Sequence, residues 1–222
     1  CPACGKAVEF FKDDTMRKCQ NCGHRFVNPN MDFGCAAYCK FADQCIGELP
    51  PELIAQRQEL MKDRIAVEMK KHFGRDFKRI GHATRVARHA EAIAEKEGGD
   101  MAVILAAAYL HDIGIPEAEK KHGSTAARYQ EEEGPEIARQ LMSDLGANEA
   151  LIDEVCDIIG HHHHPRPEES VNFKVLYDAD RIANLEDAQK AGEMDRSRAE
   201  GIIENKFLTP AGRKRAEKLF LQ

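Results

Sequence analysis

Histidine and aspartate side chains recur through the C-terminal three quarters of the chain, at positions that look like helix ends. They are His82, His111 and Asp112, the run His161–His164, and Asp180. Imidazole and carboxylate groups bind Mn, Fe, Ni, Co or Zn, and the residue types alone do not choose among these ions. His111 and Asp112 directly follow the apolar run from Ala106 to Leu110, where a buried charge would be costly unless a metal ion offset it. The pattern predicts that these side chains converge on a metal site.

Two cysteine knuckles near the N-terminus have the spacing of a zinc site. Cys1 and Cys4 precede Gly5, and Cys19 and Cys22 precede Gly23. Each glycine permits the tight turn that points backbone N–H groups at sulfur. Four thiolates predict tetrahedral zinc, as in a zinc ribbon, and the alternative of two disulfides is disfavoured in a reduced intracellular protein. A closed four-cysteine site has no open coordination position, so its expected role is folding or docking.

Three further cysteines, Cys35, Cys39 and Cys45, leave a tetrahedral ion one ligand short. His24, Asp43 or a cysteine before Cys1 would have to complete it. A second zinc ion or an iron–sulfur cluster with three cysteine ligands is the expectation, and three buried free cysteines are the alternative. Cys156, which is alone in a helical pattern, is interpreted as a core residue.

Apolar residues recur at helical spacing along most of the remaining chain. The expected helices cover Leu53–Phe73, Phe77–Glu97, Met101–Leu110, Ser124–Glu131, Pro135–Leu145, Asn148–Ile159 and Val171–Lys190, with a last one beginning at Thr209–Pro210. The predicted fold is therefore mainly α. Residues 1–50 are expected to form a cysteine-rich, zinc-ribbon-like module, and residues 51–222 a helical domain with its core over about 75–190.

Composition narrows the classes of partner. The chain has 32 Lys and Arg against 38 Asp and Glu, a net charge of −6, so a general nucleic-acid surface is not favoured. The longest apolar run, Met101 to Leu110, is about half of what a bilayer requires. We therefore expect a soluble, cytoplasmic protein without a membrane partner, and the sequence does not indicate an oligomeric state.

Four short motifs resemble the HD superfamily of metal-dependent phosphohydrolases. They begin at Gly81-His82, Tyr109-Leu110-His111-Asp112, Ile158-Ile159-Gly160-His161-His162 and Tyr177-Asp178-Ala179-Asp180, and the resemblance covers about residues 75–190. It implies an all-helical HD-domain bundle in which His82, His111, Asp112 and Asp180 hold one metal ion. In members with two ions, it further implies that Asp112 bridges them and that His161 and His162 bind the second.

The chain departs from this pattern before Gly134. Members with two ions usually have another histidine there, and residues 130–133 of this chain contain none. Either a glutamate or His122 substitutes for it, or the second ion is weak or absent.

The resemblance implies hydrolysis of a phosphoester, in a nucleotide or related small phosphorylated substrate, by a metal-activated water. Asp112 is expected to orient that water, and Arg85 and Arg181 are the first candidates for contacts with the phosphoryl oxygens. Two other functions stay open. One is a di-iron oxygenase of the HD type, and the other is a regulatory or binding module without turnover, which docks through its cysteine module.

Overall fold

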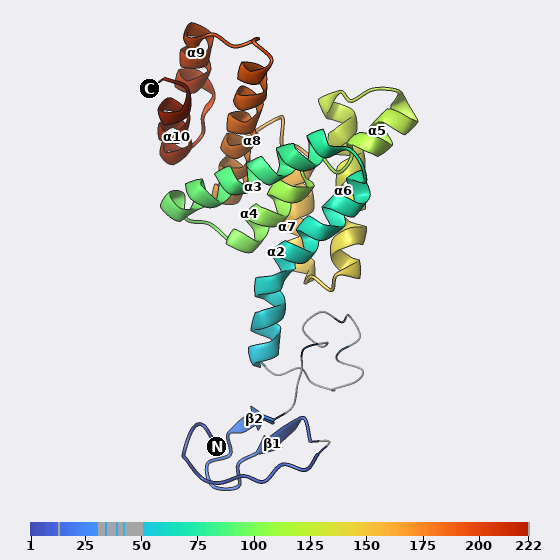
Figure 1. Ribbon diagram of the computed structural model, residues 1–222, viewed down its shortest axis with the longest axis vertical. Coiled ribbons are helices and arrows are strands. Elements are labelled where there is room, and N and C mark those ends of the chain that lie inside the picture. Colours follow the sequence, from blue (N-terminus) through green and yellow to red (C-terminus); the bar gives the residue numbers. More distant parts are fainter. Residues whose placement is uncertain (13, 31–33, 35–38, 40–41, 43–50, 222) are drawn as a thin grey trace. The chain divides into compact units, whose positions relative to one another are not determined.

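The structure is a computed structural model that describes residues 1–12, 14–30, 34, 39, 42 and 51–221, and of residues 51–59 only the course of a helix. Figure 1 shows its elements in chain order. The chain separates into two compact units, Cys1–Leu60 and Met61–Gln222, and each is described by itself. The described part of the chain is mainly helical, as predicted.

The N-terminal unit contains a short antiparallel hairpin. Strand β1 (Met16–Lys18) pairs with β2 (Arg25–Val27), with Met16 opposite Val27. The connection between the strands holds the second cysteine knuckle, and Gly23 adopts a φ of 75°, the left-handed conformation that glycine favours. The hairpin therefore presents Cys19 and Cys22 on one tight turn, as the glycine spacing predicts.

Helices make up the second unit. The boundary between the units, after Leu60, falls within the first of these helices. In chain order they are α2 (Pro51–Phe73), α3 (Phe77–Glu97), α4 (Met101–Leu110), α5 (Ile115–His122), α6 (Ala127–Asp144), α7 (Glu149–Ile159), α8 (Val171–Lys190), α9 (Arg196–Lys206) and α10 (Pro210–Phe220). Polar side chains cap several N-termini: Asp76 begins α3, Asp100 begins α4 and Ser170 begins α8.

Helix α4 is the centre of the helical core. Nearly all of its residues are buried, and it packs against α3, α7 and α8. By length and composition the stretch Met101–His122 could cross a membrane, but 67% of its most apolar window is buried inside the protein and turns at 111–114 interrupt it. The apolar character of α4 is explained by its central place, and this place brings the residues after Leu110 into the middle of the domain.

The sequence predictions for α3, α4 and α8 match the observed bounds, but the prediction for residues 124–145 was wrong. A single helix, α6, runs through Pro135 where two helices were expected. A Cβ on Gly114 would lie 2.6 Å from the backbone nitrogen of Gly134, so the two segments touch backbone to backbone. Helix α6 is thus continuous at this contact, although proline removes one helical hydrogen bond. Helices α5 and α9 were also not predicted: α5 is short, and α9 is mostly exposed and buries only Ala199 and Ile203.

Candidate metal centre

Two histidines that directly follow core helices have the same backbone anchor. Nδ1 of His111 donates to the carbonyl of Ala108 at 3.0 Å, and Nδ1 of His162 donates to the carbonyl of Ile159 at 2.8 Å. In the neutral ring, each bond leaves the lone pair on Nε2, the tautomer that binds metal. Both Nε2 atoms are buried and have no hydrogen-bond partner among the described residues. A buried polar atom without a partner is costly, and a metal ion would satisfy both.

The first histidine belongs to a cluster contributed by three elements. His82 on α3, His111 and Asp112 each offer a ligand atom, and these atoms lie within 4.8 Å of one another. Asp180 on α8 joins them, because its Oδ1 lies 2.9 Å from Nε2 of His82 and 3.5 Å from Nε2 of His111. The four side chains that the HD resemblance implies for one ion therefore converge.

The carboxylate of Asp112 lies between this cluster and a second one. Its Oδ2 is 3.4 Å from Nε2 of His111, and its Oδ1 is 4.0 Å from Nε2 of His162. Asp112, His162 and His163 again offer ligand atoms within 4.8 Å of one another. One carboxylate with an oxygen toward each cluster is the arrangement expected of a residue that bridges two ions.

The electrostatics of the clusters favour cation binding. Burial would raise the pKa of Asp112, but the positive charge on His111 lowers it to about 2. Burial also opposes ionisation of Asp180, yet the neighbouring rings of His111 and His82 lower its pKa well below the usual range. Burial lowers the pKa of His162 to about 4, so this ring is neutral near pH 7. The two carboxylates and His162 thus have the charge states that a metal ligand needs.

His111 differs from His162 in its titration. Burial lowers the pKa of His111, but the adjacent carboxylates of Asp112 and Asp180 outweigh it and raise this pKa well above the usual range. Without an ion, a proton on His111 therefore occupies the place that a metal cation would take.

Other histidines predicted as second-ion ligands are engaged elsewhere. The Nδ1 atom of His161 lies 2.5 Å from the carbonyl of Asp157, and its Nε2 lies 3.0 Å from Glu169. His122 stacks on the ring of Tyr129, and its Nε2 lies 3.0 Å from Glu133. The structure brings neither ring into the two clusters. In the second cluster, His163 lies with Asp112 and His162, where His161 was the expected ligand.

The predicted arginines have different surroundings. Arg181 stacks over the ring of Tyr177, donates to its hydroxyl and lines a pocket of about 230 Å³ together with His162, His163, Tyr177, Asp180 and Asn184. Arg85 instead donates to both carboxylate oxygens of Asp187, at 2.5 Å each. Arg181 therefore stands at the mouth of the metal centre, whereas Arg85 is bound to another side chain.

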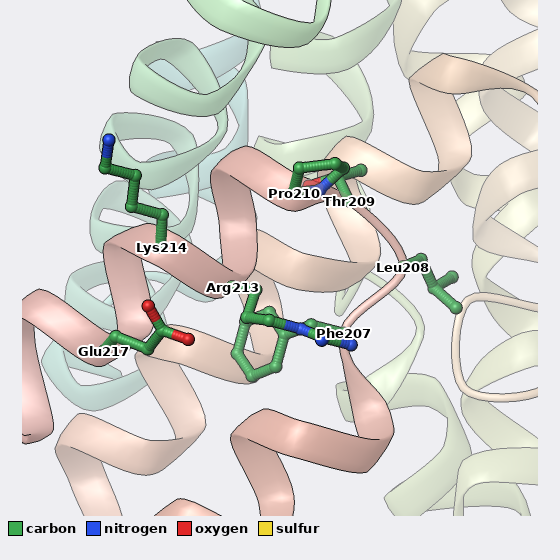
Figure 2. Close-up of a pocket in the computed structure, with 7 residues that line it drawn as sticks. All are labelled: Phe207, Leu208, Thr209, Pro210, Arg213, Lys214 and Glu217. Atoms are coloured by element: carbon green, nitrogen blue, oxygen red, sulfur yellow. The ribbon is translucent and has the colours of Figure 1, made fainter.

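A larger pocket, of about 520 Å³, lies at the start of α10. Figure 2 shows its lining: Phe207, Leu208, Thr209 and Pro210 from the segment before and into α10, and Arg213, Lys214 and Glu217 from α10. The Thr209 hydroxyl is already bonded to Asp178, and Arg213 donates to the carbonyl of Glu204. None of the predicted ligands lines this pocket, whereas His162 and Asp180 line the smaller one.

The four N-terminal cysteines also come together. Cys1, Cys4, Cys19 and Cys22 offer sulfur atoms within 4.8 Å of one another. The sulfurs of Cys1 and Cys22 are 3.6 Å apart, and those of Cys4 and Cys19 are 3.7 Å apart, far beyond the disulfide bond length of about 2.05 Å. A backbone hydrogen bond from Lys6, with others from Asn21 and Cys22, lowers the pKa of Cys4 to about 7. These residues suit a tetrahedral zinc ion. Of the other predicted cysteine site, Cys35 and Cys45 lie outside the described residues.

Sequence reasoning missed three residues at the centre. His163 was not assigned to an ion, because four consecutive histidines do not indicate which of them face inward. Asn184 and Asp187 lie four and seven positions after Asp180, on the same face of α8. Helical spacing from Asp180 could have found both.

Residues 79–185 match the family model described as the HD domain. Among solved structures, the chain is similar to the crystal structure of a predicted HD superfamily hydrolase from an uncultured Thermotogales bacterium, with 27% sequence identity and a TM-score of 0.54. That match covers 70% of this chain and 83% of the other. No curated protein matched.

Proposed function

We propose that the chain, whose residues 79–185 match the HD domain and which is similar to a predicted HD superfamily hydrolase, is a metal-dependent phosphohydrolase. Its proposed substrate is a phosphoester of a nucleotide or a related small phosphorylated molecule. The observation that carries the proposal is the pair of buried, unpartnered Nε2 atoms of His111 and His162, which face different oxygens of Asp112.

The residues of the centre fit one or two divalent transition-metal ions. His82, His111, Asp112 and Asp180 would hold the first ion, and Asp112, His162 and His163 the second. Mixed imidazole and carboxylate ligands suit Mn, Fe, Ni, Co or Zn. A bound ion would supply Lewis acidity to a phosphoryl oxygen and a water of lowered pKa.

The pocket beside the centre suits a small anionic substrate. Its volume is about 230 Å³, and the guanidinium of Arg181 supplies positive charge next to Asp180 and His163. We assign it to the phosphoryl oxygens, whose charge grows in the transition state. Asp112, held ionised by its low pKa, is positioned to orient the attacking water.

Metal analysis and hydrolysis on the same samples test the proposal. Wild type, Asp112→Ala and the control Asp153→Ala would be purified without added metal, analysed by plasma mass spectrometry and assayed on a generic phosphodiester and a nucleotide panel. Asp153 is exposed and pairs with Arg139 away from the centre. We expect wild type and control to hold transition metal beyond the cysteine-bound ion and to hydrolyse a phosphoester, and Asp112→Ala to lose both. Metal content unchanged by Asp112→Ala would contradict the proposal.

The placement of Asp112 between two clusters is also compatible with a second candidate function, that of a di-iron oxygenase. Two ions bridged by one carboxylate suit activation of dioxygen as well as of water. Anaerobically prepared, iron-loaded protein distinguishes the two, since an oxygenase consumes dioxygen with a substrate and a phosphohydrolase does not. Metal retention without either activity would favour the regulatory module.

The cysteine module and the cellular location of the protein are also part of the proposal. We infer that Cys1, Cys4, Cys19 and Cys22 hold one structural zinc ion, supported by their mutual distances and by the low pKa of Cys4. A site of thiolates is kept reduced in the cytoplasm, which is the proposed location. The same metal analysis tests this part, because Asp112→Ala should retain the cysteine-bound zinc.

A further inference from the structure

Helices α3 and α8 meet along a seam of charged and polar side chains. His82, Arg85 and His89 follow one another at spacings of three and four on α3, which is one helical face. Opposite them, Asp180, Asn184 and Asp187 form one face of α8. The seam therefore begins at the metal centre, with His82 and Asp180, and continues away from it.

Asp187 connects the two nearest side chains of α3. Its Oδ2 lies 3.3 Å from Nδ1 of His82, and both of its oxygens accept from Nη2 of Arg85 at 2.5 Å. Nε of Arg85 lies 3.3 Å from Oε2 of Glu186, so the guanidinium is held by two neighbouring carboxylates. The side chain of Arg85 is 23% exposed, and it does not line the pocket beside the metal centre.

We propose that Asp187 is a positioning residue for the ligand His82, and that Arg85 acts through Asp187 and does not contact the substrate. An ion on Nε2 of His82 requires the remaining ring proton to be on Nδ1. Asp187 is the acceptor within reach of that proton in the described part of the chain. A carboxylate at this position sets the ring orientation and makes Nε2 more basic, while Nη2 of Arg85, which donates to both oxygens, fixes the carboxylate.

Metal affinity, measured without any substrate, tests the inference. It rests on the metal centre of the proposed function, so Mn²⁺ or Co²⁺ would be titrated into metal-depleted full-length protein in competition with a chromophoric chelator. The variants are Asp187→Leu, Asp187→Asn, Arg85→Leu and the double variant. Asp153→Asn is the matched control, because it breaks a carboxylate–arginine pair of 2.6 Å that touches no ligand.

We expect Asp187→Leu to weaken metal binding roughly 10- to 100-fold. Asp187→Asn should weaken it less, since an amide oxygen still accepts from Nδ1. Arg85→Leu should weaken it too, and the double variant should bind no more weakly than Asp187→Leu alone, because the arginine acts through the aspartate. Circular dichroism of each metal-free variant shows whether it folds, and if Asp187→Leu does not, the isosteric Asp187→Asn carries the test.

The contrary outcomes are separable. Wild-type affinity in Asp187→Leu or, failing that, in Asp187→Asn would overturn the positioning role. Unchanged metal affinity with a raised KM in Arg85→Leu would assign the arginine to the substrate and overturn the second half of the inference. A wild-type protein that binds no ion beyond the one held by the four cysteines would overturn the proposed function itself.

Discussion

Asn184 donates a hydrogen bond to Oδ2 of Asp180 at 3.0 Å, while Oδ1 of the same carboxylate lies 2.9 Å from Nε2 of His82. The amide is one helical turn after the aspartate on α8, so it occupies the carboxylate oxygen that is not beside His82. Asn184 thereby decides which oxygen of Asp180 is offered to an ion.

Removing this amide should weaken metal binding. For Asn184→Leu we expect about a tenfold loss of affinity for Mn²⁺, because Asp180 can then rotate away from the other ligands. The measurement is the same chelator competition. Asn205→Leu is the control, since Asn205 donates only to the carbonyl of Gly201 on the exposed helix α9. Equal affinities in the two variants would count against a role for Asn184 at the metal.

The histidine run offers a direct comparison of neighbours. His163→Ala should remove a second ion and leave the first, because His163 belongs to the cluster of Asp112 and His162. His161→Ala should retain the second ion, since both of its ring nitrogens are engaged by Asp157 and Glu169. Metal stoichiometry under saturating Mn²⁺ distinguishes them. Loss of an ion from His161→Ala alone would restore the assignment expected from the sequence.

Two helical glycines should respond oppositely to alanine. A Cβ on Gly212 would lie 2.3 Å from Oδ2 of Asp178, which already accepts from the backbone and hydroxyl of Thr209. We expect Gly212→Ala to lower the free energy of unfolding by about 1–3 kcal/mol through overpacking. Gly201→Ala meets nothing within 4 Å and should raise it by about 0.5–1 kcal/mol. Urea unfolding measures both, and a neutral Gly212→Ala would be inconsistent with this packing.

His89 should make stability depend on pH. Its Nδ1 accepts from Nε of Arg215 at 2.9 Å, and burial, opposed by Glu186 and reinforced by Arg215, lowers its pKa from 6.5 to about 4. Between these values the unfolded chain takes up a proton that the folded protein does not. The free energy of unfolding is therefore not lowered by His89 above about pH 6.5, and it decreases as pH falls toward 4.

The size of the effect follows from the shift. Between pH 7 and pH 5, wild type should lose about 2 kcal/mol more of its unfolding free energy than His89→Gln, which cannot titrate. Urea unfolding of both proteins at the two pH values gives this difference. Parallel losses would mean that His89 is protonated in the folded protein already at pH 5.

The sequence predicted the helices that have a regular spacing of buried apolar residues. It also predicted the histidines and aspartates that lie on these helices or directly after them. The bounds of α3, α4 and α8 and the convergence of His82, His111 and Asp180 follow from local patterns and motif order. The conformation of the turn after α7 determines that His163, and not His161, lies near Asp112. The packing of α3 against α8 determines that Asp187 lies beside His82. Both are tertiary relationships, and a single sequence does not contain them in readable form.

Reconstitution of metal-depleted protein tests the central claim most directly. Hydrolysis of a phosphodiester and nucleotide panel would be followed as Mn²⁺ is added back to wild type and to Asp112→Ala. The account predicts that metal-free wild type is inactive, that Mn²⁺ restores release of at least one product, and that Asp112→Ala stays inactive at every concentration. Restoration of equal activity in both proteins, or hydrolysis without metal, would contradict it.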